Sequence, residues 1–301
     1  MTLPPLALLQ KPCKIKDSRG GPLSEAQARS EEHGQRIYPG GLMHQTERRR
    51  ILIQSLLQEN PEYEGLSVPA EPESQRQLLR GLMNLRPPQP ISPELQKLQD
   101  AYLQEETAAK GVTDLADLTP VQPGLYLWQG DITTLKCDAI VNAANSGMTG
   151  CYLPNHRCID NAIHTFAGME LRLACAELMA RQGHPEPTGQ AKITPAFNLP
   201  CRYVLHTVGP IIHGPVTQRD RALLASCYRS CLALAAENRL ESVAFCCIST
   251  GEFHFPNEQA AEIAVTAVRQ FLQQQTSVRK VIFNVFKALD RSIYEKLLRA
   301  D

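Results

Sequence analysis

A short segment in the second half of the chain carries two cysteines and a histidine close together. Cys151, His156 and Cys158 form a C-x4-H-x-C pattern within eight residues. Two thiolates and one imidazole are ligands that suit Zn²⁺. Three protein ligands leave a fourth position for water or substrate, as in catalytic zinc sites, whereas structural sites normally have four. The spacing matches no standard zinc finger, so the alternative is two buried free cysteines beside a packed histidine.

Polar and small residues also stand where apolar runs end. Asp131 follows the run 125–129, and Asn142 and Asn145 lie at the end of the next run. An acidic residue after a strand is typical of an ordinary turn, and asparagines there need hydrogen-bond partners. Residues 249–253 are small or glycine-containing and precede a helical pattern, so their N–H groups can bind a phosphate. An ordinary strand-to-helix turn is the alternative for that segment.

These residues need a scaffold, and from about residue 120 apolar, β-rich runs alternate with helical patterns. The runs are 125–129, 139–144, 191–197, 203–209, 242–248 and 280–286, and the helical patterns are about 158–181, 219–238, 257–274 and 291–299. This alternation predicts an α/β domain with a mostly parallel, buried sheet and helices on both faces. Ligands of such sheets bind in the loops after the carboxyl ends of the strands, where the polar residues above are expected.

The first part of the chain follows a different pattern. Residues 1 to about 40 contain Pro-Pro and Gly-Gly pairs, which favour a poorly ordered N-terminus. Residues 41–120 show helical periodicity and predict a small helical extension. Thr46 is expected to cap its first helix. Its third helix should start after Ser92 and end at Gly111.

Composition excludes several classes of protein. Lys plus Arg total 31 and Asp plus Glu total 31, so the chain lacks the basic excess typical of nucleic-acid-binding proteins. The triplet Arg48–Arg50 is the only basic cluster, and we expect it on a solvated helix face. No apolar run approaches the ~20 residues that span a bilayer. The N-terminus lacks a secretory pattern, which predicts a cytoplasmic protein with reduced cysteines; organellar import is the weaker alternative.

Three motifs in a fixed order resemble a known family. GDIT (130–133), VNAAN (141–145) and ISTGEFHFP (248–256) lie on the alternating part of the chain, and together they resemble the macrodomain family over about residues 121–301. Macrodomains bind ADP-ribose, and some hydrolyse it from proteins. The resemblance implies a three-layer α/β/α fold with a mostly parallel mixed central sheet, preceded here by the small helical extension.

The resemblance also implies roles for single residues. Asp131 would bind the adenine amino group and Asn145 the distal ribose. Phe253 or Phe255 would cover the ribose, and Asn284 would lie at the edge of the adenine. The segment 249–253 would surround the pyrophosphate. The full set of ADP-ribose-binding residues that the resemblance implies is Asp131, Ile132, Asn145, Cys151, Ile159, Asp160, Ser249, Thr250, Gly251, Glu252 and Phe253.

One loop departs from the common macrodomain pattern. Where a glycine-rich loop is typical, residues 150–161 carry the Cys-His-Cys set. The run GCYLPNHRCIDNAIHTFAG (150–168) resembles zinc-dependent macrodomains associated with microbial sirtuins, and their helical extension resembles residues 40–118. The resemblance implies one Zn²⁺ per chain and functional pairing with a sirtuin-type ADP-ribosyltransferase. Asp160 corresponds to an acidic residue near the distal ribose in metal-free macrodomain hydrolases, but it could alternatively only stabilise a helix dipole.

Three further histidines need an interpretation. His164 follows Cys158 on the predicted helix, so we expect it to point away from the metal. We expect its ring to be hydrogen-bonded, either in the core or behind the metal ligands. His206 lies inside a strand, where core packing is the expectation. His254 lies in the predicted phosphate loop and is the reserve metal ligand.

Taken together, these features predict a Zn²⁺-dependent hydrolase that removes mono-ADP-ribose from an acidic side chain of a target protein. Two alternatives remain: a non-catalytic ADP-ribose reader, and an O-acetyl-ADP-ribose deacetylase. The expected partners are ADP-ribose and a mono-ADP-ribosylated protein, with no nucleic acid and no membrane. The predicted catalytic residues are Cys151, His156, Cys158, Asn145 and Asp160.

Overall fold

The computed structural model describes residues 43–299. These residues form two separate hydrophobic cores. The smaller core lies among the N-terminal helices and includes Leu52, Leu79 and Leu103. The larger core surrounds the central sheet. The N-terminus that we expect to be poorly ordered, residues 1–40, lies outside the described residues.

Three helices build the extension: α1 (Gln45–Gln58), α2 (Pro72–Leu85) and α3 (Pro93–Lys110), with a 3-10 turn, η3 (Pro61–Tyr63), after α1. The third helix is bounded as predicted. The Ser92 hydroxyl accepts a hydrogen bond from the Leu95 N–H, and Gly111 follows the last turn with a φ of 87°. The prediction for Thr46 is wrong, because α1 already begins at Gln45, and its N-cap residue, His44, makes no side-chain cap.

The arginine triplet is not a solvated face. Arg48 is 4% exposed and pairs with Glu105 of α3, and Arg49 is 2% exposed and donates from Nε to Gln75 Oε1 of α2 at 3.1 Å. Only Arg50 is exposed. Adjacent residues on a helix point about 100° apart, so the triplet spans more than one face. The first two arginines therefore join α1 to its two neighbours.

Six strands form the central sheet in the order β2-β8-β7-β4-β6-β5. All neighbours are parallel except β5, an edge strand antiparallel to β6. A second, two-stranded sheet pairs β1 (Thr113–Asp114) with β3 (Leu135–Lys136). The main strands are β2 (Leu125–Gln129), β4 (Ala139–Ala143), β5 (Ala191–Pro195), β6 (Tyr203–Thr207), β7 (Ser242–Phe245) and β8 (Lys280–Val285). The mostly parallel mixed sheet is as predicted.

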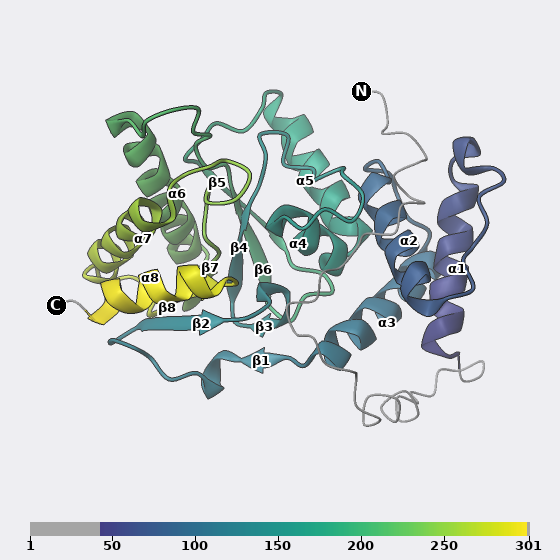
Figure 1. Ribbon diagram of the computed structural model, residues 1–301, viewed down its shortest axis with the longest axis horizontal. Helices are drawn as coiled ribbons and strands as arrows, with labels where there is room; N and C mark the ends of the chain where they lie inside the picture. The colour runs from purple at the N-terminus through teal and green to yellow at the C-terminus, as the bar shows by residue number, and fades with distance from the viewer. Residues whose placement is uncertain (1–42, 300–301) are drawn as a thin grey trace.

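Helices cover both faces of this sheet (Figure 1). The pair α4 (Ile159–Ala167) and α5 (Met169–Gln182) packs against one face, and α6 (Gln218–Glu237), α7 (Asn257–Leu272) and α8 (Ala288–Arg299) cover the other. The single helix predicted over 158–181 is in fact two. Gly168 separates them with a φ of 101°, and a Cβ there would lie 2.8 Å from Gln99 Nε2 of α3.

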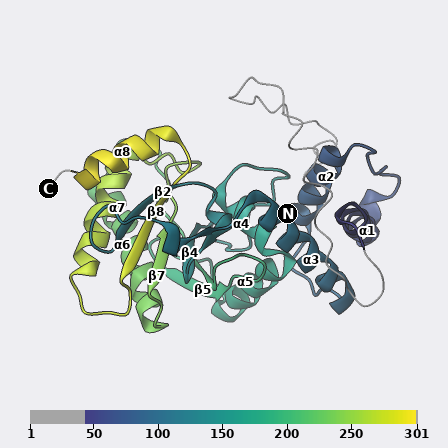
Figure 2. The ribbon, with the colours of Figure 1, turned by 90° about the horizontal axis from the view of Figure 1, so that it is seen from below.

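The extension packs on α4, at one end of the molecule. Figure 2 shows α1, α2 and α3 together beside α4, with α6, α7 and α8 at the opposite end. Two 3-10 turns, η4 (Leu115–Asp117) and η5 (Ile132–Thr134), flank β2 in the chain. None of the helices within residues 43–299 is long and apolar enough to cross a membrane.

Candidate functional site

The predicted site residues lie after strands that end at the same edge of the sheet. Because β2, β8, β7 and β4 run parallel in register, their carboxyl ends lie side by side. Asp131 follows β2, Asn145 follows β4, and Ser249 follows β7. The parallel order therefore brings together loops that are more than 100 residues apart in the chain.

The surroundings of Asp131 keep its carboxylate ionised, so that it can accept hydrogen bonds. Its Oδ1 accepts hydrogen bonds from the N–H and hydroxyl of Thr133, at 3.0 and 2.6 Å. Its Oδ2 lies 3.1 Å from the Lys110 ammonium at the end of α3. Burial acts to raise the pKa of Asp131, but the bonds from Thr133 and the charge of Lys110 outweigh it and lower the pKa. The neighbouring Ile132 is 2% exposed, so its side chain packs in the core.

The end of β8 adds an aromatic residue that the sequence analysis did not single out. Asn284, expected at the adenine edge, is 5% exposed and donates to the Gly130 carbonyl at 3.0 Å. It therefore holds the turn that carries Asp131. Phe286 follows the strand and is 75% exposed. A large apolar ring left in solvent after a strand end is the signal that points to a stacking surface.

Asn145 and Asp160 form one hydrogen-bonded group under the metal-ligand loop. Asn145 Nδ2 donates to the Gly150 carbonyl at 3.0 Å and to Asp160 Oδ2 at 3.2 Å. Asn142 Nδ2 donates to Asp160 Oδ1 at 2.8 Å. Asp160 is 5% exposed, and this burial raises its pKa to about 7 despite the bond from Asn142. Both asparagines at the end of β4 thus converge on one buried carboxyl.

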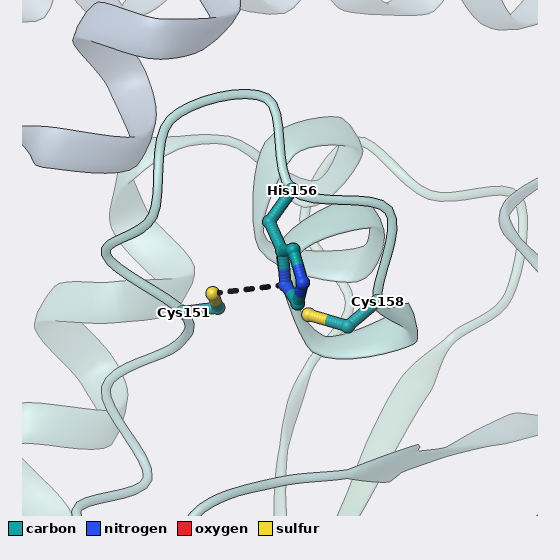
Figure 3. A group of neighbouring side chains, drawn as sticks. All are labelled: Cys151, His156 and Cys158. Atoms are coloured by element: carbon teal, nitrogen blue, oxygen red, sulfur yellow. Dashed lines mark hydrogen bonds between the residues drawn. The ribbon is translucent and has the colours of Figure 1, made fainter. Parts of the chain in front are cut away.

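The three predicted metal ligands come together in the loop before α4. Their ligand atoms, the two sulfurs and a ring nitrogen, all lie within 4.8 Å of one another. Figure 3 shows the side chains of Cys151, His156 and Cys158 converging, with Cys151 Sγ 3.5 Å from His156 Nδ1. His156 Nε2 faces Glu252, 3.6 Å away. Two soft sulfurs and an imidazole around one point fit a Zn²⁺ ion.

The two thiols lie close enough to shift each other's pKa. The hydrogen bond between them lowers the pKa of Cys151, while that bond and burial raise the pKa of Cys158. Cys158 is the N-cap of α4, and its sulfur accepts the Asn161 N–H at 3.4 Å. This bond from Asn161 acts to lower the pKa of Cys158, but the neighbouring Cys151 and burial outweigh it. Metal binding here would release the remaining thiol proton, because cysteine binds metals as the thiolate.

The segment 249–253 lies opposite the metal-ligand loop. Ser249 has a φ of 65°, and its buried hydroxyl has no hydrogen-bond partner within residues 43–299. Thr250 donates from its hydroxyl to the Cys247 carbonyl at 3.0 Å, and Gly251 and Glu252 are exposed. Of the two candidate aromatic covers, Phe253 is half-buried and Phe255 is 1% exposed. Only Phe253 therefore retains a surface for a ligand.

The other histidines divide into buried and exposed ones. His206 is fully buried, as expected, and its Nε2 lies 2.9 Å from the Thr194 hydroxyl. His164 is buried in the core, as expected, and its Nε2 lies 3.5 Å from Asp160 Oδ1, next to the site carboxyl. Within residues 43–299 neither ring nitrogen has a hydrogen-bond partner, so the expected satisfaction of the ring is not observed. The two rings and Cys175 form a second close group of metal-binding side chains, fully in the core. His254 is exposed and belongs to neither group found among the described residues.

Sequence reasoning missed the residues of α2 that contact the metal-ligand loop. Arg80 donates to the His156 carbonyl at 3.0 Å, and Asn84 Oδ1 accepts the Asn155 N–H at 3.0 Å. No local pattern marks either residue, because the partners are 76 and 71 positions away.

Comparisons with known proteins agree with this geometry. The profile of the Macro domain family matches residues 141–264. A protein-ADP-ribose hydrolase of Treponema medium is 60% identical over 260 residues, covering 85% of this chain and all of that protein. A protein-ADP-ribose hydrolase of Staphylococcus aureus (strain MSSA476) is 49% identical over 256 residues, covering 84% of this chain and 96% of the relative.

Solved structures show the same architecture. The Trypanosoma brucei macrodomain in complex with ADP-ribose superposes with a TM-score of 0.57 at 32% identity, covering 72% of this chain and 94% of that one. The chain thus has a three-layer α/β/α fold with a mostly parallel mixed sheet. The chain belongs to the macrodomain family.

Proposed function

We propose that this protein is a hydrolase that releases ADP-ribose from modified proteins. The observation that carries the proposal is the convergence of a Cys-His-Cys set with Asn145 and Asp160 at the carboxyl edge of a macrodomain sheet. The relatives from Treponema medium and Staphylococcus aureus, which are similar over most of their length, are named protein-ADP-ribose hydrolases. A reader module would need the binding loops but not a set of metal ligands beside them.

We further propose that one Zn²⁺ is held by Cys151, His156 and Cys158. A zinc ion bound there supplies a Lewis acid and lowers the pKa of a bound water toward neutrality. Glu252 faces the far nitrogen of His156 and so would fix the orientation of the ring. The lowered pKa of Cys151 favours its thiolate, which is the form that binds a cation.

The remaining residues act on the substrate through binding and orientation. Asp131 accepts from the adenine amino group, and the exposed ring of Phe286 stacks on the base. Backbone N–H groups of 249–253 surround the pyrophosphate. Asn145 orients the distal ribose, and Asp160 positions the attacking water or takes its proton. Binding energy gained at the adenine thereby holds the reacting bond in place.

The substrate we propose is mono-ADP-ribose linked as an ester to an acidic side chain of the target. An ester carbonyl is a group that a Lewis acid such as Zn²⁺ would polarise toward attack by water. The resemblance of the metal-ligand loop to sirtuin-associated macrodomains supports functional pairing with a sirtuin-type ADP-ribosyltransferase.

The deciding experiment follows release of ADP-ribose from a protein carrying ester-linked mono-ADP-ribose. Enzyme is compared as purified, after chelation, and after Zn²⁺ is restored. We expect the enzyme as purified to release ADP-ribose, the chelated enzyme to release none, and restored Zn²⁺ to recover the release. Binding without release in the zinc-loaded protein would identify a reader, and turnover of O-acetyl-ADP-ribose alone would identify a deacetylase.

A further inference from the structure

We propose that helix α2 of the extension holds the metal-ligand loop in shape, with Arg80 and Asn84 as positioning residues. The extension is then part of the functional site and more than a stabilising neighbour of the sheet. The inference deepens the proposed function and rests on it for one point only, that the loop 151–158 binds a metal. The contacts themselves are independent of that point.

Arg80 contacts the loop at the histidine itself. Its Nη2 donates to the His156 carbonyl at 3.0 Å and to Asn161 Oδ1 at 2.8 Å, and its Nε donates to the same Oδ1 at 3.2 Å. Asn161 in turn donates from Nδ2 to the Leu153 carbonyl at 3.0 Å. A guanidinium is a planar fork, so these bonds fix direction as well as distance. One side chain of α2 thus holds the loop directly at His156 and, through Asn161, at Leu153.

Asn84, one helical turn further on, holds the loop at a second place. It is 1% exposed, and its Oδ1 accepts the N–H of Asn155, which has a left-handed φ of 56°. Its Nδ2 donates to the Thr165 hydroxyl on α4 at 2.9 Å. Asparagine readily adopts this left-handed conformation, so the bond from Asn84 fixes a turn that the residue type already favours. Asn84 therefore joins the loop to α4, the helix that Cys158 caps.

Helix α2 is itself fixed to the domain beside the first cysteine. Arg172 of α5 donates from Nη1 to the Met83, Asn84 and Arg86 carbonyls, at 3.3, 2.7 and 2.6 Å. The same guanidinium lies over the ring of Tyr152, 4.2 Å from its centroid. A cation at the C-terminal end of a helix is favourable, as is a cation over an aromatic face. The residue after Cys151 and the end of α2 are thus held by one buried arginine.

These contacts matter because the loop has no regular secondary structure of its own between Cys151 and Cys158. Metal sites require their ligand distances within about 0.2 Å of the preferred values. Partners that orient metal ligands from outside the coordination sphere commonly change metal affinity about 10- to 100-fold. We therefore expect α2 to set the affinity of the loop for its metal.

The first test is a titration of the metal-free full-length protein with Co²⁺, whose absorption reports tetrahedral sulfur and nitrogen ligation. Arg80→Ala should raise the Kd about 10- to 100-fold and alter the spectrum. The Kd of Arg80→Lys should stay close to that of Arg80→Ala, because lysine keeps the charge but lacks the planar guanidinium. The matched control is Arg76→Ala, one turn earlier on α2, where the side chain is 38% exposed and pairs with Glu73 and Glu106.

The second test needs no metal. In the metal-free protein, Arg80→Ala and Asn84→Ala should speed hydrogen exchange of residues 151–158 while strands β4 and β8 exchange as in the wild type. Wild-type exchange in both variants would overturn the inference, as would wild-type Co²⁺ affinity in Arg80→Ala or full recovery in Arg80→Lys. If the wild-type protein binds no Co²⁺, the metal part of the proposed function fails, while the exchange experiment still decides whether α2 holds the loop.

Discussion

The Lys110 ammonium at the end of α3 lies 3.1 Å from the Asp131 carboxylate, the proposed adenine acceptor after β2. The same ammonium lies 3.1 Å from the ring centroid of Phe166 on α4. The extension thus contacts the proposed ligand site at the adenine side through Lys110 and at the metal side through Arg80. Both contacts join a residue of the extension to a loop at the sheet edge.

The ion pair of Lys110 and Asp131 should contribute little to the free energy of unfolding. Its side chains are 33% and 38% exposed, so water screens the charges, and pairs of this kind contribute about 0.2–1 kcal/mol. The coupling energy follows from the free energies of unfolding of the wild type, Lys110→Met, Asp131→Asn and the double variant. A coupling that persists unchanged in high salt would contradict this interpretation, because exposed charges are screened.

Asp131→Ala should weaken binding of free ADP-ribose. The change removes an acceptor for the adenine amino group, a loss of about 1–3 kcal/mol where the partner stays buried. Calorimetry on the purified variants measures it. Asp114→Ala is the control, because Asp114 pairs with Lys136 in the small second sheet and belongs to none of the proposed binding loops. Equal affinity in both variants would remove Asp131 from the site.

The sequence predicts those parts of the fold and the site whose interacting residues lie close together in the chain or follow from the order of the strands. The strands could be placed because each is a short apolar run, and their parallel order brought Asp131, Asn145 and Ser249 to one edge. Cys151, His156 and Cys158 could be grouped because they lie within eight residues. The relatives support the hydrolase assignment and leave zinc and the acidic linkage as proposals.

What the sequence could not predict depends on contacts between distant segments. Burial of Arg48 and Arg49 follows from where α2 and α3 pack, which the pattern of α1 alone does not contain. At the break after Gly168, Gln99 of α3 accepts the Met169 N–H at 2.8 Å, a contact that spans 70 positions of the chain. The bond from Arg80 to the His156 carbonyl crosses 76 positions and leaves no periodic signal.

Chelation should abolish hydrolysis before it unfolds the domain. The proposed metal binds one loop, whereas the sheet is held by its own core, in which strand residues such as Val141, Leu205 and Phe283 are almost fully buried. Activity and thermal melting, followed in parallel during titration with chelator, test this expectation. A collapse of the melting temperature at the chelator concentration that stops turnover would make the metal chiefly structural.

Acidification should destabilise the protein through its buried neutral histidines. Burial lowers the pKa of His206 to about 3 from an ordinary 6.5, and burial lowers that of His164 well below its ordinary value. Between the folded-state pKa and the ordinary value of 6.5, each histidine binds a proton in the unfolded chain but not in the folded one. The contribution of these histidines to the free energy of unfolding therefore falls as the pH drops from 6.5 toward 3. His206→Gln should flatten this dependence between pH 6.5 and 5. His184→Gln, at an exposed site, is the control, and parallel curves for all three proteins would contradict the prediction.

The last prediction treats Cys151, His156 and Cys158 as one unit. Each would supply one of three bonds to a metal with an open fourth position, so losing any one leaves two ligands, too few to hold Zn²⁺ firmly. Each single alanine variant should therefore lose bound zinc and nearly all turnover to a similar degree.

The triple variant should be little worse than a single one, because residues that act as a unit are not additive. Cys175→Ala is the control. Cys175 is buried on α5 within the other cluster, so its loss should cost stability but keep zinc. Metal content and single-turnover rate, measured on all five variants, decide the matter. Full zinc occupancy in His156→Ala, or losses that add up across the three positions, would show that these side chains do not share one ion.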